Sequence, residues 1–128
     1  MVRIFGLVLM LMFGNVSAEA QNTQEFLPLV KQAYKEVWKY NLSEAENLLS
    51  KDKNQNLAHI YVSEEKWFLE IFATEDISKY NAYKVIKENA LNKIEAGRQS
   101  LPFYFFARSE IYLHSAIIKL KFGEYASA

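Results

Sequence analysis

The two histidines are the first residues whose side chains suggest chemistry, because an imidazole binds metals and exchanges protons near neutral pH. His59 and His114 lie far apart in the chain, and neither has a carboxylate at a spacing typical of a shared metal site. His59 opens the stretch HIYVSE, which does not match the H-E-x-x-H zinc motif. His114 falls on an apolar stripe, so we expect a core or interface histidine whose polar atoms are satisfied. No metal site is predicted.

Glu64 is the acid that stands out, because it lies between Ile60 and Phe68 on an apolar helical face. A buried acid with a raised pKa can be a functional group. It can equally be a carboxylate at the edge of the stripe, bonded to a nearby tyrosine or lysine. The sequence has no glycine-rich phosphate loop, no nucleophile elbow and no cysteine nucleophile. We therefore predict no catalytic residue, no cofactor and no enzyme activity in this stretch.

Helical periodicity runs through the segments that must position these residues. Five helices are predicted, over residues 24–39, 43–50, 56–74, 76–96 and 101–122. Ser43 with Glu46 three residues later resembles a capping box, Ser100 is placed to cap the last helix, and Gly97 is placed to end the fourth. The last helix is apolar on nearly every side, which is typical of a helix buried between others. With no strand pattern, the predicted fold class is all-α.

Residues 1–20 have the order of a signal peptide. Arg3 gives a positive n-region, residues 4–13 form an apolar run, and small residues follow up to Ala18 and Ala20, either of which can precede the cleavage site. The run is shorter than the roughly 20 apolar residues that a membrane-spanning helix needs. We expect an exported protein, periplasmic or secreted, with no integral membrane segment after cleavage.

The composition limits the kinds of partner. The chain has 15 basic and 15 acidic residues without a basic cluster, which argues against nucleic acid and anionic membrane surfaces. It has no cysteine, so neither a disulfide nor a lipid-modified cysteine can form. Glycine and proline are scarce and aromatic residues plentiful, which favours long helices with large side chains between them. Residues 21–128 are long enough for one domain with its own core.

The first helical pair resembles the end of the chain when it is shifted by 83 positions, so that Ala33 falls on Ala116 and Ala45 on Ala128. The match breaks down at two positions where an apolar residue is aligned with a charged one: Leu27 with Glu110 and Trp38 with Lys121. Helices approach within about 8–10 Å only where the contact residues are small. An alanine on each arm of a helical pair therefore predicts a close crossing.

The motif GEYASA, residues 123–128, resembles the G-x-Y-x-x-A core of a tetratricopeptide repeat, with Ala116 as the small residue of its first helix. Residues 41–45 carry a weaker version that lacks the glycine and the aromatic. The spacing of 83 is not a multiple of this repeat's 34 residues, so residues 56–96 would form an enlarged unit. The resemblance implies a short α-solenoid, similar to the N-terminal portion of repeat proteins of the bacterial envelope. It implies structural roles for Ala33, Ala45, Ala116, Gly123, Tyr125 and Ala128.

The resemblance also implies that the chain binds a protein or a peptide and has no chemistry of its own. The inner face of each first helix lines the groove in this family, and here that face carries Leu27, Val30, Tyr34, Val37 and Trp38. Large aromatic residues are enriched where partners dock. Aromatic residues at helical spacing also suit a core, and both interpretations stay open for Tyr34 and Trp38.

A further helix predicted to start at Glu124 has no room for the three turns that would cover the helix before it. We therefore expect that this chain is the front part of a longer protein, or that a partner supplies the cover. Without that cover we expect residues 21–128 to self-associate. The alternative function is the helical N-terminal part of a larger enzyme or ligand carrier, whose active site would lie beyond residue 128.

Overall fold

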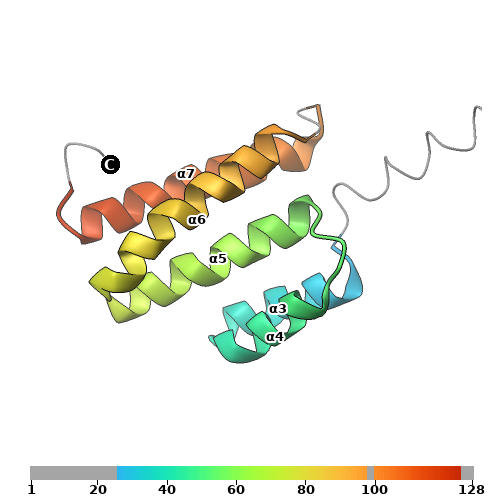
Figure 1. The fold of residues 1–128 in the computed structure, drawn as a ribbon, viewed down its shortest axis with the longest axis horizontal. Helices are drawn as coiled ribbons and strands as arrows, with labels where there is room; N and C mark the ends of the chain where they lie inside the picture. The colour runs from blue at the N-terminus through green and yellow to red at the C-terminus, as the bar shows by residue number, and fades with distance from the viewer. Residues whose placement is uncertain (1–25, 98–99, 125–128) are drawn as a thin grey trace, which may run out of the picture.

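The structure, a computed structural model, describes residues 26–97 and 100–124, which form helices joined by short connections (Figure 1). The helices are α3 (Pro28–Trp38), α4 (Leu42–Lys51), α5 (Leu57–Thr74), α6 (Ile77–Glu95) and α7 (Pro102–Lys121). These described residues contain no strand, which confirms the all-α class. The predicted signal peptide and the repeat positions Tyr125 and Ala128 lie outside the described residues.

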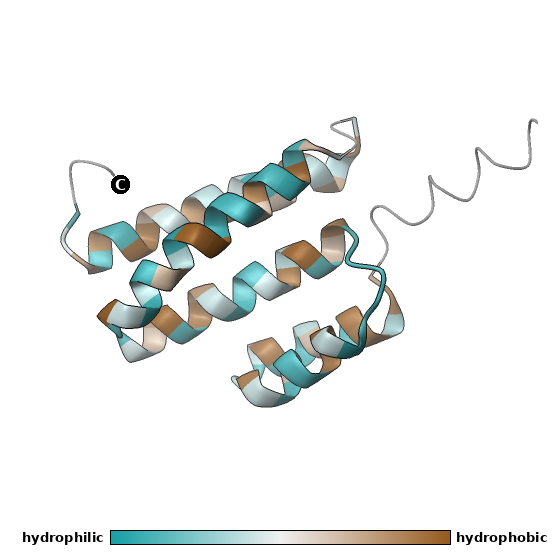
Figure 2. Ribbon diagram, in the orientation of Figure 1, coloured by the Kyte–Doolittle hydropathy of each residue, from teal (hydrophilic) through white to brown (hydrophobic). Residues whose placement is uncertain are grey.

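Helix α5 is the centre of the arrangement, because it contacts each of the other four helices. The α3–α4 pair packs on one side of it, and α6 and α7 pack on the other (Figure 1). Hydrophobic residues alternate with hydrophilic ones along these helices (Figure 2). The stacking of helical pairs into a solenoid stays a prediction.

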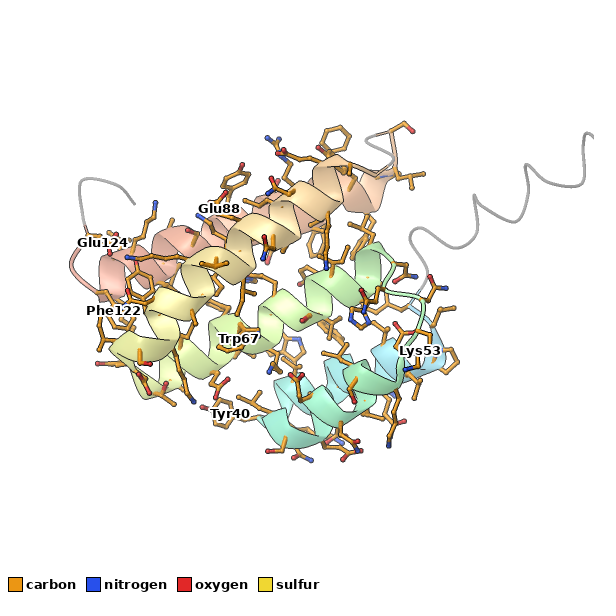
Figure 3. All side chains as sticks on the ribbon, viewed as in Figure 1. Tyr40, Lys53, Trp67, Glu88, Phe122 and Glu124 are labelled. Atoms are coloured by element: carbon orange, nitrogen blue, oxygen red, sulfur yellow. The ribbon has the colours of Figure 1, made fainter. Side chains whose placement is uncertain are left out.

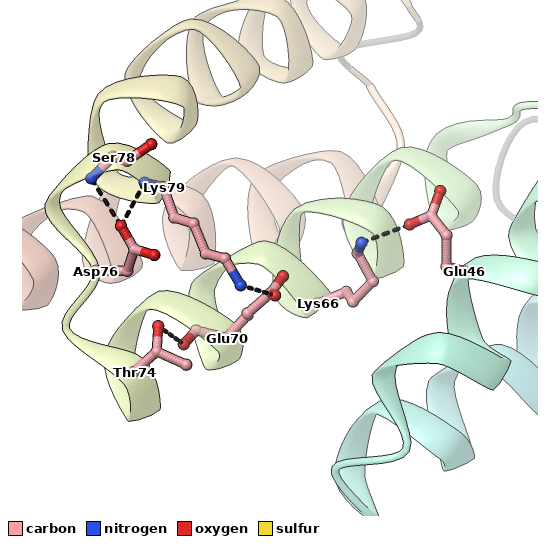
Figure 4. A network of polar contacts seen from close by, with 7 residues as sticks. All are labelled: Glu46, Lys66, Glu70, Thr74, Asp76, Ser78 and Lys79. Carbon is pink, nitrogen blue, oxygen red and sulfur yellow. Dashed lines mark hydrogen bonds and ion pairs between the residues drawn. The ribbon is translucent and has the colours of Figure 1, made fainter.

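Side-chain caps begin the two central helices. Oδ1 of Asn56 accepts a hydrogen bond from the backbone N–H of His59 at the start of α5. Oδ1 of Asp76 accepts from the backbone N–H groups of Ser78 and Lys79 at the start of α6 (Figure 4). Each cap satisfies backbone donors that the first turn of a helix leaves without a partner. The predicted break near residues 74–76 is confirmed.

The predicted caps Ser43 and Ser100 are wrong. Helix α4 starts directly after Asn41, which places Ser43 inside the helix, and Glu46 forms an ion pair with Lys66 of α5 instead of closing a capping box (Figure 4). The N-cap residue of α7 is Leu101, which makes no side-chain cap bond. The next residue is Pro102, whose fixed φ is already suited to a first helical turn.

Both α3 and α7 end in a Schellman motif. The N–H groups of Tyr40 and Asn41 donate to carbonyls in the last turn of α3 at 2.9 Å each. Those of Gly123 and Glu124 do the same in α7, at 3.1 and 2.8 Å. The turning residue has a positive φ in each motif, 58° at Tyr40 and 80° at Gly123. These two residues are 83 positions apart, so the shift seen in the sequence also matches two helix ends of the same conformation.

The left-handed conformation of Tyr40 is a source of strain that glycine would relieve. We expect Tyr40→Gly to be more stable than Tyr40→Ala by about 1 kcal/mol in urea unfolding, since both lose the ring and only alanine keeps a Cβ. Gly123→Ala should lower the stability by a similar amount, because a Cβ there meets open space and only the backbone conformation is disfavoured. Equal stability of the two Tyr40 variants would contradict this account.

The apolar core has two parts. The larger one draws buried residues from all five helices, and a smaller one lies towards the α5–α6 turn and consists of Ile71, Tyr80, Tyr83 and Ile118. Ala33 and Ala45 are both completely buried where α3 and α4 pack together, as a close crossing requires. Ala116 is half-buried on α7.

Candidate functional site

Helices α5 and α7 enclose acidic side chains around a single imidazole, a group that we name the acid–imidazole cluster: Glu64, Glu65, Glu110 and His114. Nδ1 of His114 lies 2.9 Å from Oε2 of Glu64. Nε2 of the same ring lies 3.8 Å from Oε2 of Glu65 and 3.7 Å from Oε2 of Glu110. Glu64, Glu65 and His114 are 1, 2 and 4% exposed, so their charges lie within the core.

Aromatic side chains hold the cluster in place. The hydroxyl of Tyr83, on α6, donates a hydrogen bond to Oε1 of Glu64. The ring of Phe68 stacks on the imidazole of His114 with 4.0 Å between centroids. Tyr61 lies next to Glu65 and lowers the pKa of that carboxyl, whose buried Oε2 has no hydrogen-bond partner within the described residues. Glu64 is thus fully satisfied, whereas Glu65 is not.

Burial and neighbouring charges shift the proton affinities of these groups. Burial raises the pKa of Glu65, and the opposing effects of Tyr61 and His114 are smaller. Burial by itself lowers the pKa of His114, but the hydrogen bond with Glu64 and the charges of Glu64, Glu65 and Glu110 together raise it above the ordinary value. Burial and the charge of Glu64 also raise the pKa of Tyr83, which stays a hydrogen-bond donor. The cluster is therefore suited to keeping protons inside the core.

The bond between Glu64 and a tyrosine is confirmed, but its expected place at the edge of the apolar stripe is wrong, because Glu64 is 1% exposed. His114 is a buried, hydrogen-bonded histidine as expected. Sequence reasoning missed the contact between the two, because they are 50 residues apart on different helices. It also missed Glu65 and Glu110. A signal was present in the spacing, since Glu110 precedes His114 by one helical turn.

An open cavity of about 280 Å³ lies between α5 and α6, and Glu64 is part of its wall. A smaller cavity of about 150 Å³ lies next to it and shares the lining residues Gln55, Ile60 and Lys93. The half-buried indole of Trp67, labelled on α5 in Figure 3, also lines the larger cavity. The mixture of aromatic and polar lining suits a small polar ligand better than a purely apolar one.

The structure places the predicted groove residues of the first helix on two kinds of surface. Val30 and Val37 are completely buried, so they belong to the core and offer no surface to a partner. The physical reason is that α3 packs against both α4 and α5, and these two residues belong to the shared core. Leu27 and Tyr34 are half-buried, and the Tyr34 ring lies 6.4 Å from that of Tyr61 on α5. Trp38 is 59% exposed, so its side chain is accessible to a partner. Its role in binding stays a prediction.

Helix α7 is not buried on all sides, contrary to the expectation from its composition. One side packs on α5 and α6, and the other carries large apolar side chains that are 47–58% exposed. We name this second side the outer face of α7: Phe105, Phe106, Tyr112, Leu113 and Leu120. Large apolar side chains that stay exposed on one side of a helix are typical of a site that another molecule covers.

No protein-family model, curated protein or solved structure matches this chain. Its class is therefore defined by its own features: an all-α domain with a buried acid–imidazole cluster and an apolar outer face on α7. Within residues 26–97 and 100–124, no helix is long and apolar enough to span a membrane. Over the same residues, no group of three or more His, Cys, Asp or Glu side chains is arranged to hold a metal ion.

Proposed function

We propose that this chain is an exported helical-repeat module, similar to tetratricopeptide-repeat proteins, that binds another envelope protein or a peptide as a scaffold or adaptor. It acts through its surface and has no catalytic site or cofactor. The observation that carries the proposal is the outer face of α7, where large apolar side chains stay about half exposed.

The exposed apolar area of these side chains is surface whose burial by a partner would stabilise a complex. Full burial of a leucine-sized side chain is worth roughly 1.5–3 kcal/mol. The side chains of the outer face are about half exposed, so a covering partner would gain about half of that amount for each residue it buries. Part of that gain is lost to the entropy of association, so only the surplus appears as affinity.

Photo-crosslinking in the producing cell tests the proposal. A photoreactive residue at Phe105 or Leu113, on the outer face, should give discrete adducts with a partner. The matched control is Val85 on α6, which is 62% exposed but lies outside that face. Adducts that are no more abundant at Phe105 and Leu113 than at Val85 would contradict the proposal.

The purified protein allows a second measurement of the same face. Residues 21–128 should self-associate with rising concentration in light scattering, because the copies cover one another's apolar surface. Leu113→Ser should reduce this association, whereas Val85→Ser should not. Both variants must keep the helical circular-dichroism spectrum of the parent protein for the comparison to hold.

The exported state rests on the order of charge, apolar run and small residues in residues 1–20. Intact-mass measurement of the exported protein tests it directly. We expect a chain that starts after Ala18 or Ala20, and a chain that retains Met1 would contradict export by cleavage.

A further inference from the structure

The acid–imidazole cluster has one basic side chain for three acids. Both nitrogens of His114 face carboxylates, Glu64 at Nδ1 and the pair Glu65 and Glu110 at Nε2. A neutral imidazole has a proton on only one nitrogen, so its other lone pair would point at a negative charge. The imidazolium is the form that matches this geometry, because it carries a proton towards each side.

In the part of the chain that the structure describes, no second cation forms an ion pair with these acids, although Lys93 of α6 lines the same cavity as Glu64. Within the described residues, His114 is the one basic side chain that pairs with these three acids. Lys66, the residue after Glu65 on α5, forms its ion pair with Glu46 of α4 instead.

The other titratable groups that face the cluster are phenols. Tyr61 of α5 lies against Glu65, and Tyr83 of α6 donates to Glu64. Tyr34 of α3 and Tyr80 of α6 lie behind them, next to Tyr61 and Tyr83. Phenols stay neutral across the physiological pH range, so none of them offsets the charge of the acids.

Deprotonation therefore changes the balance of charge across one helix contact. Glu64 and Glu65 belong to α5, while Glu110 and His114 belong to α7. When His114 and Glu65 lose their protons, α5 and α7 face each other with carboxylates alone, in a core that solvates charge poorly. The raised pKa values of Glu65 and His114 have the same sign, since both groups bind protons more tightly in the folded chain.

We propose that the acid–imidazole cluster makes the contact between α5 and α7 pH-sensitive. The protonated cluster holds α7 against α5, and loss of its protons loosens α7. The stability that these protons contribute is complete below the unfolded pKa values and is lost as the pH rises through the folded ones. The contact between α5 and α7 is thus tightest in mildly acidic solution. This regulation concerns the inner side of α7 and does not depend on the proposed partner of its outer face.

Thiol trapping measures the opening of α7 directly, because the natural chain has no cysteine. Ala107 on α7 and Ala45 on α4 are both completely buried. Ala107→Cys reports the α7 contact, and Ala45→Cys is the matched control at the α3–α4 crossing. The ratio of their labelling rates with a small thiol reagent removes the pH dependence of thiol chemistry itself.

We expect this ratio to rise several-fold between about pH 6 and about pH 8.5. Glu65→Gln, which imitates the protonated acid, should remove most of the rise. A ratio that does not change with pH would overturn the proposal. A rise that persists in a folded Glu65→Gln variant would also overturn it.

Nuclear magnetic resonance of the unmodified protein gives a test that needs no change to the cluster. The chain has only two histidines, so His59→Gln assigns the imidazole signals. His114 should titrate above its ordinary pKa of about 6.5, and the midpoint should fall within the pH range where labelling at position 107 increases. Titration of His114 at or below the ordinary value would overturn the proposal, even if Glu65→Gln fails to fold.

Discussion

Replacing His114 by leucine is expected to lower the free energy of unfolding by about 3–5 kcal/mol. Leucine fills much of the imidazole volume, so the loss is mainly electrostatic and leaves little cavity. The variant removes the partner of Glu64 at 2.9 Å and the imidazole that faces Glu65 at 3.8 Å. An uncompensated carboxylate in the core must then be protonated or exposed by local unfolding. Urea unfolding at about pH 6, where the parent imidazole is charged, measures the effect.

Two further variants separate this electrostatic effect from loss of packing. Ser115→Ala changes the next residue, which is also buried but uncharged, and should cost little. Adding Glu64→Gln to His114→Leu should recover part of the loss, because the carboxylate that was left alone is gone. If His114→Leu is no less stable than Ser115→Ala, the buried ion pair does not support the fold.

Ala33→Leu should force α3 and α4 apart and lower the free energy of unfolding by about 1–3 kcal/mol. Ala33 is completely buried, and so is Ala45 on the other arm of the pair. The larger side chain therefore has no space unless the helices move or neighbouring rotamers become strained.

The matched control is Ala73→Leu, at an exposed position near the end of α5. Its change should stay within about 0.5 kcal/mol, because surface substitutions rarely do more. Thermal or chemical unfolding of both variants decides the point. An equal effect of the two substitutions would mean that α3 and α4 do not meet at Ala33.

Local signals in the sequence were sufficient for the helices themselves. The break near Asp76 follows from a side chain that bonds its own next backbone groups. The positive φ of Gly123 follows similarly from a residue without a Cβ at a helix end. Each of these depends on residues within one or two turns, so the chain alone carries the information.

Local signals failed where two of them competed for the same turn. Ser43 and Glu46 have the spacing of a capping box, but the Schellman motif at Tyr40 leads directly into α4 and starts that helix earlier. Glu46 is then free to pair with Lys66 across the gap to α5. One cap stabilises a helix by about 1 kcal/mol. This is too little to move the start of α4 when the packing of α3 and α4 sets the connection between them.

Helical periodicity and small residues predict from the chain alone that this protein is helical, where its helices run and which alanines let α3 and α4 approach. Only the tertiary structure brought Glu64 and Glu65 of α5 against His114 and Glu110 of α7. It also decided that one side of α7 meets α5 while Phe105 and Leu113 face outwards. The physical reason is that periodicity defines the faces of each helix, whereas the choice of which face is covered depends on contacts between helices far apart in the chain.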